Sequence, residues 1–162
     1  MISHQLLRRY PFFGFLDEVQ LRAIAMVAEE LLLESGQTLF TEGQPADALY
    51  ILEDGYIELY YLANESESLD FNGILVGGIC PGEVIAISSL IEPHILTSTA
   101  RASKPSRVIK INACALLDLL KTDRRLAYVL THQAAKTAVE RLLTTRIQLA
   151  AVWAKEADQV TL

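Results

Sequence analysis

The chain has 162 residues, of which 51% are hydrophobic and 21% charged, so intrinsic disorder is excluded and one domain with a buried core is expected. No stretch approaches the ~20 apolar residues that a membrane span needs, and the N-terminus lacks the apolar run of a signal peptide. The net charge of −6 is uneven: residues 1–120 hold 7 Lys and Arg against 16 Asp and Glu, which argues against a nucleic-acid surface on the main body.

The first 30 residues are expected to form an N-terminal helical segment. Residues 11–15 carry three aromatic rings and are interrupted by Pro and Gly, so they should place their rings in the core without continuing a helix. Residues 17–30 are predicted to form an amphipathic helix capped by Asp17, with apolar positions at Val19, Ile24, Val27 and Ala28.

From residue 31 to residue 111 short β-type runs alternate with turn signals and no helical pattern intervenes. This alternation of short strands and turns predicts an antiparallel sandwich or a jelly-roll barrel. The pair Asp54-Gly55 lies between two apolar runs and is the strongest hairpin signal in the chain. The polar and acidic residues 64–72 are predicted to form an exposed loop.

A helical pattern returns at Asn112, first over a short segment and then from Thr122 or Asp123 to about residue 155. The long helix carries one apolar row at Leu126, Leu130, Ala134, Ala138 and Leu142. A second row consists of Val139, Leu143, Ile147 and Ala150 and ends near Trp153. A helix on a barrel needs only one such stripe, so the second row is interpreted as the interface of a homodimer. The alternative, that both rows are buried within one monomer, stays open.

The run SGQTLFTEGQPADALYILEDGYIELYY at residues 35–61 resembles the opening of a cyclic-nucleotide-binding domain of the catabolite-activator and Fnr type. The matching positions are Gly36, Leu39, Phe40, Gly43, Tyr50, Ile51, Leu52 and Gly55. The resemblance extends over about residues 5–155. It implies a mainly β fold: a double-stranded β-helix (jelly-roll) barrel with short N-terminal helices and a long C-terminal dimerisation helix. The expected organisation is a single domain of residues 1–162, with a helical segment at 1–30, the β-barrel at 31–111 and C-terminal helices at 112–155.

The resemblance also indicates where the family's ligand contacts would lie. In the family a Gly-Glu pair opens a short helix, the Glu accepts a hydrogen bond from the ribose, and an Arg followed by a small residue pairs with the cyclic phosphate. Here Ala86 and Ile87 stand in place of the Gly-Glu pair and Leu96 in place of the Arg. An alternative register uses Gly82 and Glu83 as the pair and again finds no Arg at the phosphate position.

The segment that would hold these contacts, here called the cassette, is therefore predicted to be degenerate. Its candidate ligand-binding residues are Gly82, Glu83, Ala86, Ile87, Ser88, Ser89, Leu96, Thr97, Ser98 and Arg101. Two interpretations of Arg101 stay open. It either points inward on the same strand face as Thr97 and Thr99, or faces outward as the family's Arg-Ala pair implies. The hydroxyl groups either line a neutral pocket or satisfy nearby backbone groups.

Catalytic chemistry is not indicated. His4, His94 and His132 lie in three separate units without metal-ligand spacing, and there is no nucleophile–base pair, so we expect a non-enzyme without metal or other cofactor. Cys80 and Cys114 lack metal-ligand spacing and are expected to be buried in a reduced, cytoplasmic protein.

The function expected from the sequence is that of a sensor or regulatory domain in signal transduction that no longer binds cAMP or cGMP in the usual way. We expect a homodimer, with a small molecule as an optional ligand and no DNA-binding domain or membrane segment within this chain. Two alternatives stay open: a functional cyclic-nucleotide receptor with an unusual cassette, and a ligand-free structural dimerisation module.

Overall fold

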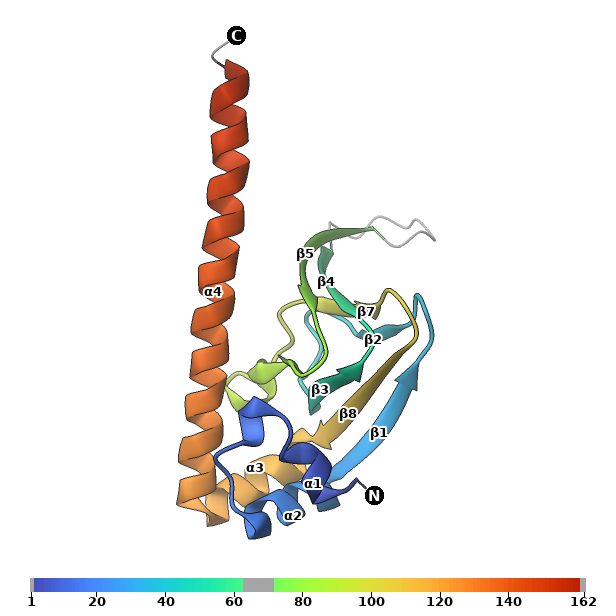
Figure 1. Cartoon of the computed structure of the whole chain (residues 1–162), viewed down its shortest axis with the longest axis vertical. Coiled ribbons are helices and arrows are strands. Elements are labelled where there is room, and N and C mark those ends of the chain that lie inside the picture. Colours follow the sequence, from blue (N-terminus) through green and yellow to red (C-terminus); the bar gives the residue numbers. More distant parts are fainter. Residues whose placement is uncertain (1, 63–71, 161–162) are drawn as a thin grey trace.

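The computed structural model describes residues 2–62 and 72–160, and in them two four-stranded antiparallel sheets face each other (Figure 1). One sheet has the strand order β1-β8-β3-β6 and the other β2-β7-β4-β5. This arrangement confirms the expected jelly-roll architecture with flanking helices. The strands are β1 (Ala28–Leu33), β2 (Thr38–Phe40), β3 (Ala48–Asp54), β4 (Ile57–Leu62), β5 (Gly73–Ile79), β6 (Val84–Ile85), β7 (Thr99–Ala102) and β8 (Ser106–Asn112).

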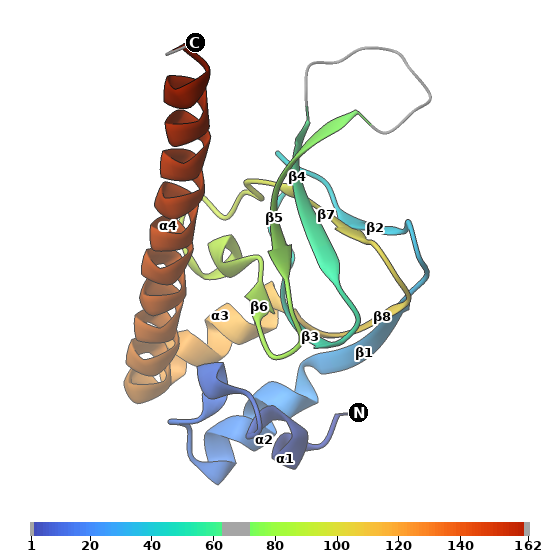
Figure 2. The ribbon, with the colours of Figure 1, turned by 45° about the horizontal axis from the view of Figure 1, so that its top comes forward.

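Helices cover one end and one side of the sheets. α1, α2 and α3 lie together at the base, and α4 runs along the side and continues well beyond it (Figures 1 and 2). The α-helices are α1 (His4–Leu7), α2 (Glu18–Met26), α3 (Ala113–Thr122) and α4 (Arg124–Val160), and the short 3₁₀ helices are η1 (Pro11–Phe13) and η2 (Ile87–Leu90). No helix in the described ranges is long and apolar enough to cross a bilayer.

The pleat of β3 divides the apolar residues into two cores. Ala48, Tyr50 and Leu52 face the space between the two sheets, whereas Leu49 and Ile51 face the helices. Successive residues of a strand point to opposite faces, so the continuous apolar run of β3 serves both cores at once. The core between the sheets is the one that positions the candidate ligand site.

The N-terminal helix begins as predicted but ends sooner. Asp17 caps α2 by accepting a hydrogen bond from the backbone N–H of Gln20 at 2.9 Å, and the Gln20 side chain accepts one in return from the Asp17 N–H. α2 stops at Met26 because the chain then pairs with β8 from Ala28 onward, three residues before the expected start of the barrel. Val19 is 78% exposed, so the prediction that it belongs to the buried face was wrong.

The hairpin predicted at Asp54-Gly55 is also wrong. β3 pairs with β8 and β6, whereas β4 pairs with β5 and β7, so Gly55 carries the chain from one sheet to the other. The backbone N–H of Tyr56 donates to the Ser106 hydroxyl at 3.1 Å, and the Tyr56 carbonyl accepts from Ser103 N–H. These bonds hold the chain to the turn before β8, where a hairpin would have returned it to β3.

The hairpin in this region is formed by β4 and β5, whose register runs from Ile57 opposite Ile79 to Leu62 opposite Gly73. Most of the loop predicted at 64–72 lies outside the described residues. Cys80 and Cys114 are both exposed, which contradicts the expectation that they are buried. Cys80 follows the last residue of β5, at the turn into β6, and Cys114 lies on a solvent-facing side of α3, where apolar sequence neighbours do not imply burial.

The two apolar rows of α4 behave differently. Leu126, Leu130 and Ala134 of the first row are buried against the body, but its last two positions, Ala138 and Leu142, are exposed. The second row is exposed along its length, with Val139 at 66%, Leu143 at 59% and Ile147 at 63%. The alternative in which both rows are buried within one monomer is therefore wrong for this chain.

Candidate functional site

The cassette region begins where β6 runs into the 3₁₀ helix η2. Ala86 is the residue before this helix and has φ 63° and ψ 45°, a left-handed conformation that costs a non-glycine residue about 1–2 kcal/mol. The resemblance predicts a Gly at this position, and here an alanine adopts the left-handed conformation instead. A helical turn follows Ala86 directly, which agrees with the register that pairs Ala86 and Ile87.

The alternative pair, Gly82 and Glu83, forms the turn between β5 and β6. Gly82 has φ +94°, and the Glu83 carboxylate accepts a hydrogen bond from the Cys80 N–H at 2.6 Å. The next residues are those of strand β6, so no helix N-terminus opens after this pair. This local bond also shows what Glu83 does in the fold: it closes the turn.

The two apolar replacements in the cassette lie on different cores. Leu96 is 5% exposed and packs in the core between the sheets. Ile87 is half-buried and packs against the helix-side core instead. The structure therefore does not bring these two positions together around one cavity.

Among the hydroxyl candidates, Ser89 is fully buried and its Oγ has no hydrogen-bond partner among the described residues. The carbonyl of the same residue lies 3.0 Å from the Nδ1 of His94, which has a positive φ of 58°. Thr97 is exposed, and Ser88 and Ser98 are half-buried. These four side chains are not gathered into one lining.

Arg101 has a structural partner. Its Nε donates to the carbonyl oxygen of Gly36 at 2.7 Å, which ties β7 to the turn between β1 and β2. Ala100 and Ala102, its neighbours in the strand, are both fully buried in the core between the sheets. Strand alternation thus puts Arg101 on the outer face, which agrees with the outward-facing interpretation.

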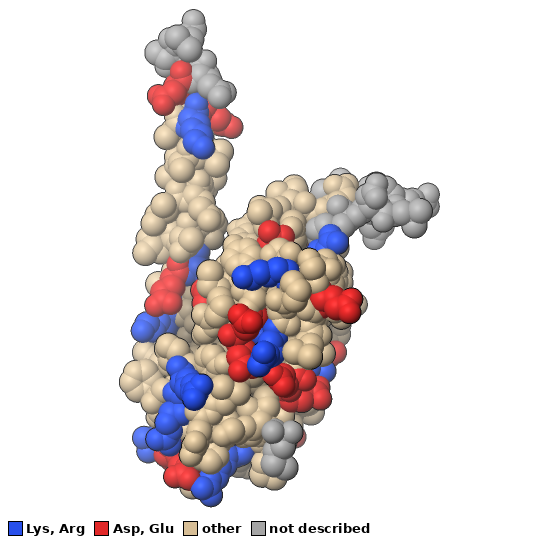
Figure 3. All heavy atoms as spheres, turned by 45° about the vertical axis from the view of Figure 1, so that its right-hand side comes forward, with Lys and Arg blue, Asp and Glu red and all other residues tan. Residues whose placement is uncertain are grey.

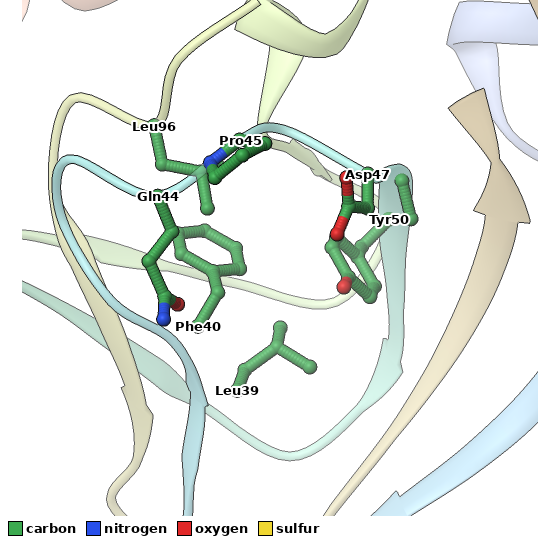
Figure 4. Close-up of a pocket in the computed structure, with 8 residues that line it drawn as sticks. Leu39, Phe40, Gln44, Pro45, Asp47, Tyr50 and Leu96 are labelled. Carbon is green, nitrogen blue, oxygen red and sulfur yellow. The ribbon is translucent and has the colours of Figure 1, made fainter. Parts of the chain in front are cut away.

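A pocket of about 230 Å³ opens beside Leu96, where the segment between β2 and β3 crosses the end of the inter-sheet core (Figure 4). Its buried side is formed by Phe40, Ala48, Tyr50 and Leu96, and its mouth by the exposed Gln44, Pro45 and Asp47 together with the half-buried Leu39. Of these residues only Leu96 was a sequence candidate. The sequence signal that could have indicated this pocket is Asp47. It stands three positions before Tyr50, an aromatic residue of β3 that faces the core between the sheets.

A second pocket, of about 210 Å³, lies between α4 and the turn that contains Gly82 and Glu83. Arg141 of α4 reaches into it and donates a hydrogen bond to the carbonyl of Val84. Burial lowers the pKa of Arg141, and the nearby Glu83 carboxylate partly opposes this effect. The candidate set is thus divided, with Leu96 at one pocket and Gly82 and Glu83 at the other.

No group of three or more His, Cys, Asp or Glu side chains that could hold a metal ion occurs among the residues that the structure describes.

The chain is similar to one known protein family. The model of the family described as "Cyclic nucleotide-binding domain" matches residues 30–123. A comparison with curated proteins gave no match.

Three solved structures illustrate the similarity. A candidate cyclic nucleotide-binding protein from Geobacter metallireducens is 37% identical, with a TM-score of 0.78, over 88% of this chain and 99% of that one. The N-terminal domain of a transcriptional regulator from Streptomyces coelicolor is 28% identical, with a TM-score of 0.64, over 83% and 93%. The regulatory domain of Toxoplasma gondii PKA with cAMP is 20% identical, with a TM-score of 0.60, over 71% and 42%, and shares the fold.

Proposed function

The chain belongs to the cyclic nucleotide-binding domain family, and from this premise we propose that it is a non-enzymatic sensor domain that no longer binds cAMP or cGMP in the usual way. Under this proposal the chain keeps the regulatory fold of the family but has lost its cyclic-phosphate site. The fold and its long helix are retained, whereas the residues that compensate a buried phosphate are replaced.

The observation that carries the proposal is the environment of Leu96. The resemblance places this residue where an Arg pairs with the phosphate, and here it is 5% exposed in the core between the sheets. A phosphate entering beside Leu96 would lose hydration without meeting a cation, because none of the residues that line this pocket is Lys, Arg or His. Burying an unpaired charge is strongly unfavourable.

The size of the effect follows from the contacts that are replaced. Hydrogen bonds to charged groups contribute about 1.5–3 kcal/mol each. Losing the Glu and the Arg contacts together would weaken binding by about 4 kcal/mol, or roughly a thousandfold. A micromolar site would then become a millimolar one. The pocket volume of about 230 Å³ is also below the roughly 300–1,000 Å³ of typical ligand pockets.

We further propose that the domain is a cytoplasmic homodimer joined along α4. Support comes from the exposed row of Val139, Leu143, Ile147 and Ala150, which continues past the point where the helix leaves the body. Figure 3 shows charged side chains of both signs spread over the body, while a stretch of the projecting helix presents almost only uncharged side chains in this view. Apolar residues at helical spacing on a free helix are typical of helix pairing.

Isothermal titration calorimetry with cAMP and with cGMP tests the loss of nucleotide binding. We expect dissociation constants weaker than about 1 mM for both nucleotides, in line with the thousandfold estimate. A dissociation constant below about 10 μM for either one would contradict the proposal and favour a receptor with an unusual cassette.

A further inference from the structure

Among the residues that line the pocket beside Leu96, Asp47 carries the one carboxylate, and none is Lys, Arg or His. Asp47 is exposed at the mouth, and in Figure 4 its carboxylate lies next to Tyr50 at one side of the cavity. Within the described part of the chain this carboxylate has no hydrogen bond or ion pair with another residue. It is therefore available to a ligand.

Two aromatic rings form part of the buried side of the pocket. Phe40 is 9% and Tyr50 8% exposed, and their ring centroids lie 5.7 Å apart with an interplanar angle of 31°. Aromatic faces attract cations through the negative potential of the ring, and the attraction grows when the cation is desolvated. A wall of this kind next to a carboxylate is complementary to a positive charge on an apolar group.

The carboxylates near the pocket also give it a negative electrostatic potential. The pKa of Tyr50 is raised by burial and, in addition, by the carboxylates of Asp47 and Glu29. The phenol accordingly stays protonated at neutral pH, and negative charge nearby makes an anion a poor occupant. The same field favours a cation.

We propose that this pocket binds a small organic ammonium ion, with its cationic head against the rings of Phe40 and Tyr50 and the Asp47 carboxylate as its counter-ion. The volume of about 230 Å³ lies below the roughly 300–1,000 Å³ of typical drug-sized ligand pockets, so we expect a ligand of about choline's size. The inference rests on the proposed function in one respect: the pocket is not occupied by a cyclic nucleotide.

Choline and its uncharged isostere, in which carbon replaces the quaternary nitrogen, are the probes for this proposal. Titration calorimetry should show choline binding at least ~10-fold more tightly than the isostere, because only the charge differs. The Asp47→Asn variant should weaken choline binding at least ~10-fold and leave the isostere unaffected. Asp54→Asn, which alters an exposed carboxylate outside the pocket lining, is the matched control and should leave choline binding unchanged.

Phe40→Leu provides the test of the aromatic wall, with circular dichroism to show that the variant is folded. It should weaken choline binding more than binding of the isostere. Equal affinity for both probes, choline binding that survives Asp47→Asn, or no heat from choline at ~10 mM would each overturn the proposal. A cAMP titration run in parallel keeps the two proposals apart, because micromolar cAMP binding contradicts the proposed function whatever choline does.

Discussion

The guanidinium group of Arg141 donates a hydrogen bond to the carbonyl oxygen of Val84, and so ties α4 to the strand that leads into η2. The two residues are far apart in the chain, and Val84 is buried. This bond joins the long helix directly to the backbone of the cassette region. Position changes in η2 and in α4 are therefore expected to be linked in this chain.

Replacing Arg141 with Met keeps most of the packing of the side chain and removes the donors. The Val84 carbonyl would lose its partner, so we expect the free energy of unfolding to fall by about 1–2 kcal/mol. Urea denaturation followed by circular dichroism measures this change. Lys155→Met, an equivalent loss of positive charge at an exposed position of the same helix, is the control and should change it by less than about 0.5 kcal/mol. Equal values for the two variants would show that the bond to Val84 is not stabilising.

Asp123 joins the beginning of α4 to α2 through hydrogen bonds to its carboxylate. Its carboxylate accepts hydrogen bonds from the Gln20 side chain and from the Leu126 N–H, both at 2.9 Å. The pKa of Asp123 is lowered from 3.8, first by the Gln20 bond and then by the backbone bonds. A lowered folded-state pKa means that the contribution is complete above the unfolded value and is lost as pH falls through the folded one.

We therefore expect the melting temperature to fall on acidification below about pH 4, and to fall less steeply in Asp123→Asn. Asn also caps helices well but cannot ionise, so the variant separates the charge from the cap. Thermal unfolding at a series of pH values between about 5 and 2 measures the slopes. Identical slopes in the two proteins would mean that the carboxylate form gains nothing from these bonds.

The turn at Gly55 shows why the fold could be predicted in class but not in its connections. Asp54-Gly55 is a hairpin signal by local chemistry, and Gly55 does adopt a positive φ of 107°. What decides its role is Ser106, whose Oγ would lie 2.1 Å from a Cβ at position 55 and which binds the Tyr56 N–H. A contact between residues 50 positions apart in sequence leaves no trace in a local pattern.

The sequence could locate residues of the candidate site only where they belong to a family motif. The resemblance located Leu96, and strand alternation accounts for the inward direction of Tyr50. The meeting of Tyr50 with Phe40 depends on how the two sheets face each other, since these residues belong to different sheets. That Ile87 and Leu96 pack against different cores likewise follows from tertiary structure alone.

Charged substitutions in the exposed row of α4 test the proposed dimer. Leu143→Glu with Ile147→Glu would place carboxylates in an apolar helix pair, so we expect the variant to be a monomer of 18.0 kDa and the unaltered chain to have twice that mass. Size-exclusion chromatography with light scattering gives the masses. The pair Met26→Glu and Leu32→Glu, which alters exposed apolar residues away from α4, should leave the dimer intact. A variant that unfolds, or an unaltered chain that is a monomer, would contradict the proposed interface.

Reintroducing the two polar residues that the cassette lacks, as Ile87→Glu with Leu96→Arg, tests whether the site is lost in shape as well as in charge. Arg at position 96 would enter the core between the sheets, whereas Glu at position 87 would lie against the helix-side core, so the two side chains would belong to different cores. We therefore expect the double variant to remain weaker than about 1 mM for cAMP, and to be less stable because it buries an unpaired cation. Leu96→Met, which keeps the volume and adds no charge, should be almost as stable as the unaltered chain. Micromolar binding of cAMP to the double variant, measured by titration calorimetry, would show that the cassette geometry survives and that only its charges are missing.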